Sequence, residues 1–257
     1  MKFTRSLLGA WTFAVMLFFY LPIVILVAFS FNTSRLNIVW EGFTLQWYSA
    51  LWRDAVLVQT LDNSLIVATV ATIVSVVLGT AGAWLLYRHR FPAARLVITL
   101  VFIPMIIPEV IMGVSLLILF VTLGLELGYA TIIISHVTFC FPFVLVAVQA
   151  RLAGLDPALE EAAMDLGATP AGAFRRVLIP YLMPAIVSGA LMSFTLSLDE
   201  LIVTYFTASA ATRTLPLEIF GRVKRGLDPT LNAISTVFIA STVGLVLATE
   251  ILKRRAR

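Results

Sequence analysis

Charged residues are scarce in this sequence. They make up 12% of the 257 residues, whereas they make up about a quarter of an ordinary soluble domain. Hydrophobic residues account for 60% of the chain, and the mean hydropathy is +1.01. This balance excludes an ordinary soluble domain and predicts a membrane protein.

Residues that commonly carry chemistry are also rare. Cys140 is the one cysteine, and His89 and His136 are the two histidines, so the sequence excludes an intrachain disulfide and offers no metal-ligand spacing. The chain has three lysines and no G-x-x-x-x-G-K-[ST] phosphate-binding loop. We therefore expect no catalytic residue, metal site or cofactor in this chain, and we read His136 as a packing residue.

Long apolar runs are what the sequence does contain. A membrane-crossing helix needs about 20 mainly apolar residues, and this predicts an all-α polytopic protein with one transmembrane domain over residues 1–257. The first run is longer than the apolar core of a secretory signal, so we expect it to be a retained span. The six predicted spans are residues 8–30, 64–87, 96–122, 129–149, 182–206 and 231–252.

The distribution of positive charge predicts the orientation. With both termini in the cytoplasm, the cytoplasmic segments hold 12 of the 18 Lys and Arg residues, which agrees with the positive-inside rule. The external loop 40–54 carries an aromatic helical face after Thr44 as a possible N-cap, suited to the membrane surface or to a partner. The external residues 207–230 could form a solvated connection or a short helix.

The cytoplasmic loop 150–181 shows two helix starts. Asp156 and Pro157 fit a helix N-terminus, and Gly167 fits its end. Thr169 and Pro170 repeat the start signal directly afterwards. The loop therefore predicts two short helices at an angle, the second ended or kinked by Pro180.

This loop resembles the EAA loop of ATP-binding-cassette (ABC) importer permeases with the MetI-like fold, type I importers. The matching residues are Glu161, Ala162, Ala163, Gly167, Val177, Ile179 and Pro180. The resemblance implies a coupling helix that docks on a separate ATPase subunit, which would bind ATP and magnesium. Small Ala162 and Ala163 would permit close approach, and Glu160 or Glu161 could pair with a basic residue of the ATPase.

Three carboxylates interrupt the predicted spans. Glu109 follows two prolines in the third span, and Asp199 and Glu200 are adjacent in the fifth. Ionisable side chains at membrane depth are costly and mark candidate pathways. Broken backbone there is tolerated where it lines a cavity, so we expect Glu109 at a cavity. On a regular helix Asp199 and Glu200 would point about 100 degrees apart, and they could not both face one ligand.

Residues 103–120, 193–206 and 214–239 are similar to the second permease of spermidine/putrescine importers. The resemblance implies a small cationic solute, because carboxylates compensate the desolvation of amines. Asp-Glu in place of Asp-Asp at 199–200 and the sequence of 207–214 depart from that branch, and opines, amino-acid derivatives and organophosphonates remain alternative substrates.

The same resemblance implies partners and a location in the bacterial inner membrane. The partners would be a homologous second permease, two ATPase copies and a periplasmic or extracellular substrate-binding protein. A proton-coupled secondary transporter is an alternative, but no inverted repeat between the two halves supports it. An exporter would not be expected to carry the EAA loop.

Overall fold

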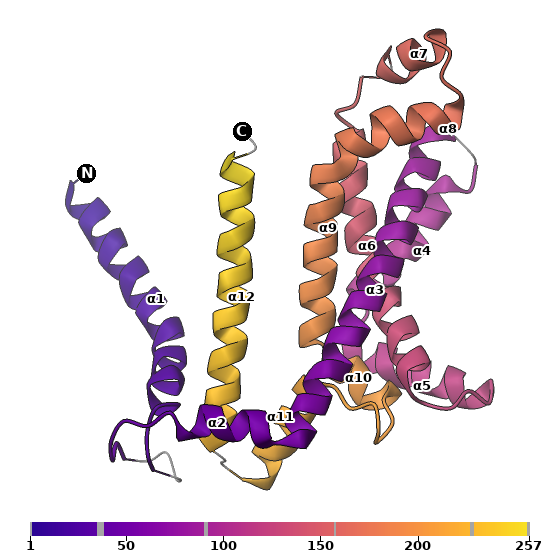
Figure 1. The fold of residues 1–257 in the computed structure, drawn as a ribbon. Helices are drawn as coiled ribbons and strands as arrows, with labels where there is room; N and C mark the ends of the chain where they lie inside the picture. Colours follow the sequence, from indigo (N-terminus) through magenta and orange to yellow (C-terminus); the bar gives the residue numbers. More distant parts are fainter. Residues whose placement is uncertain (1, 35–38, 90–91, 157, 227–228, 256–257) are drawn as a thin grey trace. The chain divides into compact units, whose positions relative to one another are not determined.

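The computed structural model describes residues 2–34, 39–89, 92–156, 158–226 and 229–255, and these form a helical protein (Figure 1). An isolated bridge between Asn32 and Phe43 is the β pairing within these ranges. The helices are α1 (Lys2–Phe29), α2 (Gln46–Arg53), α3 (Ala55–Arg88), α4 (Ala94–Ile106), α5 (Glu109–Thr122), α6 (Tyr129–Leu152), α7 (Ala158–Asp165), α8 (Pro170–Ala173), the π-helical turn η1 (Phe174–Leu178), α9 (Ile179–Asp199), α10 (Ile202–Thr207), α11 (Leu215–Arg225) and α12 (Pro229–Arg255).

The chain divides into two compact units, Met1–Gln59 with Glu218–Arg257, and Thr60–Leu217. In the first unit, α12 packs against both α1 and α2. Thr44 accepts a hydrogen bond from the Gln46 amide at 3.1 Å, but Leu45 takes the N-cap position of α2. An ion pair of 2.8 Å between Asp54 and Arg222 joins the end of α2 to α11.

In the second unit, α6 and α9 pack extensively against each other. Gly189 of α9 permits this approach, because a Cβ atom there would lie 3.1 Å from the Cα atom of Val144 in α6. Ser193 and Ser197, one and two turns further along α9, are also buried. These small residues of α9 thus form a helix-packing surface.

Two of the predicted spans are broken in this unit. The third span consists of α4 and α5, bent by 108° at Ile107 and Pro108. The predicted fifth span, 182–206, also contains a break, because α9 ends at Asp199 and the separate helix α10 follows. No glycine or proline in the sequence marks this break at Glu200.

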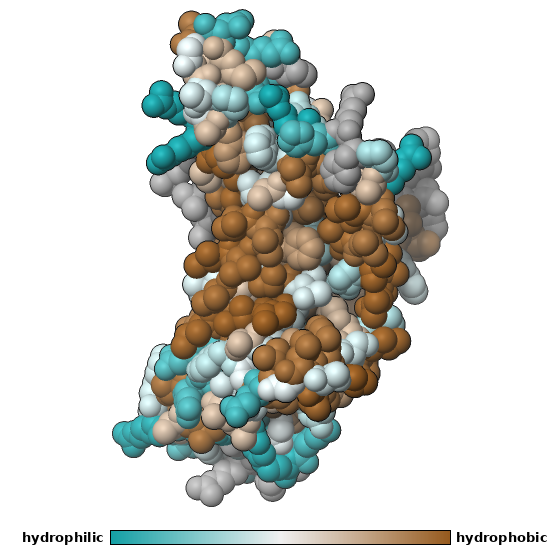
Figure 2. All heavy atoms as spheres, turned by 90° about the vertical axis from the view of Figure 1, so that its right-hand side faces the viewer, coloured by the Kyte–Doolittle hydropathy of each residue, from teal (hydrophilic) through white to brown (hydrophobic). Residues whose placement is uncertain are grey.

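Among the described residues, four helical segments are long and apolar enough to cross a membrane: Leu7–Phe29, Ala55–Arg88, Tyr129–Leu152 and Pro170–Asp199. The bent pair of α4 and α5 would be a fifth span. The predicted sixth span, 231–252, lies within α12, which is not among these segments. Figure 2, seen from the side of α4 and α5, shows hydrophobic side chains in a wide band between two more hydrophilic ends. A band of this kind suits a chain embedded in lipid.

Candidate functional site

The break between α4 and α5 positions Glu109. Ile107 precedes Pro108 and has an extended backbone (ψ 133°), as steric contact with a following proline requires. Pro108 then becomes the N-cap of α5, and Glu109 is its first residue. Pro108 therefore interrupts the span as the sequence predicts, whereas Pro104 lies within α4.

The break between α9 and α10 positions Glu200. Its backbone leaves the helix (φ −69°, ψ 119°), and its carboxylate accepts a hydrogen bond from the Val203 amide at 2.7 Å. Glu200 is 8% exposed. The carboxylate is thus fixed by the first turn of the helix that follows the break.

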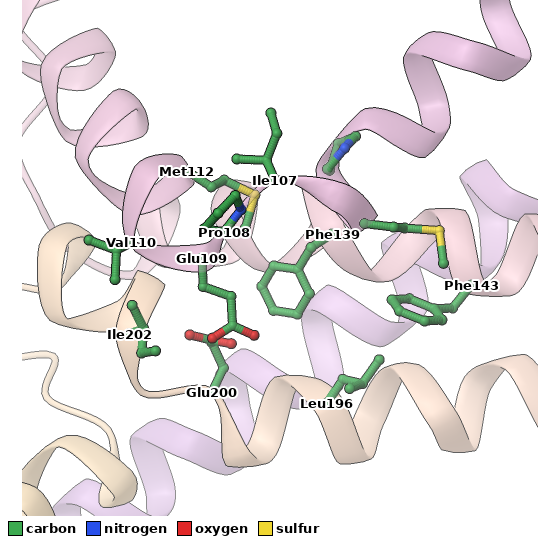
Figure 3. A pocket seen from close by; sticks show the side chains of 12 residues that line it. Ile107, Pro108, Glu109, Val110, Met112, Phe139, Phe143, Leu196, Glu200 and Ile202 are labelled. Carbon is green, nitrogen blue, oxygen red and sulfur yellow. The ribbon is translucent and has the colours of Figure 1, made fainter.

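Glu109 and Glu200 line the same cavity, whose volume is about 490 Å³. Figure 3 shows their carboxylates pointing toward one another. The other lining residues are apolar and come from α4, α5, α6, α9, α10 and the α4–α5 break: Pro104, Met105, Ile107, Pro108, Val110, Met112, Phe139, Phe143, Leu196 and Ile202. Two carboxylates in an apolar wall without a lining Lys, Arg or His favour a cationic ligand.

Sequence reasoning missed two aromatic lining residues. Phe139 and Phe143 are one helical turn apart on α6 and both line the cavity. Their i, i+4 spacing is a usable signal, but the fourth span carries other apolar residues at the same spacing. An aromatic ring can also attract an ammonium group through its face.

Asp199 lies outside this cavity. It is the last residue of α9, is exposed, and is not among the lining residues, whereas Glu200 is. The two adjacent carboxylates therefore have different surroundings. We expected the two side chains to point in different directions, and they do. The cause is the end of the helix at Glu200 and not the rotation of about 100 degrees per residue along a regular helix.

The prediction that His136 is a satisfied packing residue is confirmed. Its side chain is fully buried on α6, and both ring nitrogens have hydroxyl partners, Ser197 and Thr204. Within the described ranges, no group of three or more His, Cys, Asp or Glu residues could hold a metal ion.

The loop 150–181 contains the predicted helix signals. Asp156 accepts a hydrogen bond from the Ala158 amide at 3.0 Å, at the start of α7, while Pro157 lies outside the described residues. Gly167 has a φ of +88° after α7, a conformation that favours glycine. Thr169 caps α8 by accepting from the Gly172 amide at 3.1 Å.

Pro180 does not end the second helix of this loop. The helical backbone continues from α8 through η1 into α9, and Pro180 lies in the first turn of α9. Figure 1 shows that this run bends between α8 and the main part of α9. The wider π-helical turn directly before Pro180 is the kind of adjustment that accommodates a proline lacking a backbone N–H.

The faces of α7 differ in their surroundings. Glu160 is buried, and its carboxylate lies 3.1 Å from the Arg88 guanidinium at the end of α3. Glu161 and Ala162 are exposed and Ala163 is partly so. Leu159 is also exposed, and Leu166 is 90% exposed. The exposed leucines of α7 therefore point away from the rest of the second unit, and Glu160 is engaged within the chain.

Residues 75–257 match the family of binding-protein-dependent transport system inner membrane components. The chain belongs to this family. It is 39% identical over 250 residues to the spermidine/putrescine transport system permease protein PotC of Escherichia coli (strain K12), covering 97% of this chain and 95% of that protein. It is 41% identical over 236 residues to the putrescine transport system permease protein PotI of the same strain, covering 89% and 84%.

Solved structures share the fold. A bacterial ABC transporter that imports the acidic polysaccharide alginate matches with a TM-score of 0.74 and 14% identity, covering 98% of this chain and 96% of that chain. The methionine ABC transporter MetNI in an inward-facing conformation matches with a TM-score of 0.65 and 23% identity, covering 81% and 97%. The chain is therefore a transport permease component with the helical fold of these transporters.

Proposed function

We propose that this chain is one permease subunit of an ATP-driven importer for a small polyamine such as putrescine or spermidine. The observation that carries the substrate class is the cavity with Glu109 and Glu200 facing one another. The relatives PotC and PotI, which are named for spermidine and putrescine transport, support the same class. A polyamine places ammonium groups on an apolar carbon chain, and the cavity offers carboxylates in an apolar wall.

The proposed assembly contains six spans in a single permease domain, 1–257, with both termini in the cytoplasm. The second span would lie within α3, the third would be the bent pair α4 and α5, and the sixth would lie within α12. The permease would pair with a second permease in the bacterial inner membrane and receive its solute from a binding protein outside. A related alginate importer was solved with its periplasmic binding protein.

ATP hydrolysis would take place in two copies of a separate cytoplasmic subunit, which would hold ATP and magnesium. In this proposal, α7 docks on that subunit through Glu161, Ala162 and Ala163, with Gly167 turning the chain after it and Pro180 in the bend that follows. The exposed apolar side chains Leu159 and Leu166 favour such a contact. Glu160 would contribute by tying α7 to α3 through Arg88.

The solute would pass Glu109 and Glu200 in the second unit. Asp199, exposed at the surface of the single chain, would belong to the part of the path formed with the second permease. Among the residues that the structure describes, no lining residue of the cavity is cationic, which disfavours the anionic alternatives such as organophosphonates.

Uptake of radiolabelled putrescine into proteoliposomes tests this proposal. The full assembly is reconstituted with internal ATP, and Glu109→Gln and Glu200→Gln are compared with the wild type. Losing one charge-assisted contact should raise KM roughly tenfold. Glu126→Gln, which removes an exposed carboxylate outside the cavity, should keep the wild-type KM.

An unchanged KM in both Glu109→Gln and Glu200→Gln would contradict the cation path. Adding a proton ionophore to the ATP-loaded proteoliposomes distinguishes an ATP-driven importer from a proton-coupled transporter. Uptake that persists after the ionophore is added supports the importer. Uptake that stops when the proton gradient is lost, although ATP is still present, supports a secondary transporter.

A further inference from the structure

His136 makes a bridge between α9 and α10. Its Nδ1 atom lies 2.7 Å from the Ser197 hydroxyl, and its Nε2 atom lies 2.9 Å from the Thr204 hydroxyl. Ser197 is near the end of α9 and Thr204 is in α10. A side chain from α6 thus connects the two helices on either side of the break.

Glu200 lies between the two residues that His136 connects. The Thr204 hydroxyl donates to the Glu200 carbonyl at 3.2 Å, and the Val203 amide donates to the Glu200 carboxylate at 2.7 Å. The backbone and the side chain of Glu200 are therefore both held by the turn that His136 contacts. The imidazole ring also lies 5.4 Å from the ring of Phe139, which lines the cavity.

The hydrogen bonds define one consistent proton arrangement. When the Thr204 hydroxyl donates its hydrogen bond to the Glu200 backbone carbonyl, its oxygen is left to accept from Nε2–H of His136, which selects that tautomer. Nδ1 then accepts from the Ser197 hydroxyl. A neutral imidazole forms hydrogen bonds with both hydroxyls in this way, whereas an apolar ring could form neither of them.

We propose that His136 is a positioning residue for the solute: by bridging Ser197 and Thr204, it fixes the break between α9 and α10 and keeps the Glu200 carboxylate opposite Glu109. This inference rests on the proposed cation path and adds a residue that does not line the cavity. Packing alone would require only the volume of the ring. Positioning requires both nitrogen atoms, and its effect must pass through Glu200.

Putrescine uptake by the reconstituted assembly tests this dependence with His136→Phe, Glu200→Gln and the double variant. His136→Phe keeps an aromatic ring and removes both bonds, so KM should rise roughly three- to tenfold. In the Glu200→Gln background the same substitution should change KM by less than about twofold, because the positioned charge is already absent. Uptake is normalised to the amount of permease in the membrane.

A matched series separates the two bonds. Thr204→Val keeps the side-chain shape while removing the α10 end of the bridge, and it should also raise KM. His136→Gln places an amide where it can reach Thr204 and should restore part of the loss seen in His136→Phe. Thr204→Val also provides the test if His136→Phe fails to enter the membrane.

The outcomes distinguish this inference from the proposed function. A wild-type KM in both Glu109→Gln and Glu200→Gln contradicts the cation path, and the inference with it. A wild-type KM in Glu200→Gln alone, with a raised KM in Glu109→Gln, overturns only the inference. A raised KM in Glu200→Gln together with a wild-type KM in both His136→Phe and Thr204→Val overturns the inference alone. Equal effects of His136→Phe in the presence and absence of the Glu200 carboxylate also overturn it, because a purely structural role acts independently of that charge.

Discussion

The same residue type has different roles at different positions in this chain. Glu160 is buried against Arg88, Glu161 is exposed on α7, and Glu200 lies in a cavity between apolar side chains. Sequence patterns separated the loop carboxylates from those in the spans. They did not separate Glu160 from Glu161. The sequence shows which residues share a helix face, but a face is buried only when a neighbouring element covers it.

Asp54 provides a residue-scale prediction about pH. Burial raises the pKa of Asp54, but hydrogen bonds from Arg222 and from the Leu57 and Val56 amides, together with the charge of Arg222, outweigh it, so the net pKa is lowered. Arg222 also pairs with Glu218, which pairs with Arg225. A lowered carboxyl pKa contributes stability that is present above the unfolded-state pKa of about 3.9 and is lost as pH falls through the folded-state pKa.

We therefore expect Asp54→Asn to lower the melting temperature of the detergent-solubilised chain at neutral pH. The difference from the wild type should shrink as pH falls below about 4. Melting curves recorded by intrinsic fluorescence at a series of pH values measure this difference. A difference that stays constant down to pH values at which carboxylates are protonated would contradict the assignment.

At the scale of elements, broken helices carry the proposed function. Proline predicts the break between α4 and α5, since it constrains its own φ and the residue before it. The break between α9 and α10 has no such signal. It is associated with tertiary hydrogen bonds from His136, which come from a different helix.

The helix α7 gives the element-scale prediction. Glu161→Lys reverses a charge on its exposed face and should reduce ATP-driven uptake at least tenfold, because truncating or reversing one partner of an interfacial charge pair costs about 2–5 kcal/mol. The amount of permease in the membrane should stay the same. The measurement is uptake together with co-purification of the ATPase subunit.

Glu126→Lys is the matched control, because it makes the same charge change in an exposed loop outside α7. It should retain both uptake and co-purification. Normal co-purification and uptake in Glu161→Lys would exclude this face of α7 as the docking surface.

At the scale of the whole molecule, the distribution of positive charge and the apolar runs predict a topology that cysteine labelling can test. Cys140 is fully buried, so the wild-type chain should react little with a membrane-impermeant maleimide. Leu166→Cys, at a side chain that is 90% exposed, should react in inside-out vesicles. Glu126→Cys should react in right-side-out vesicles, and labelling of both variants from one side would contradict the six-span topology.

The sequence by itself determined the helical class, the family, the cap residues of α7 and α8 and the break before Glu109, because these depend on composition and on local backbone preferences. Tertiary structure decided that Glu200 and Glu109 share a cavity, that Asp199 stays outside it, that Glu160 faces Arg88 and that helix continues through Pro180. These features depend on which helices lie side by side. Residues as far apart in sequence as Glu109 and Glu200 meet only through packing of α5, α6 and α9, which local preferences do not specify.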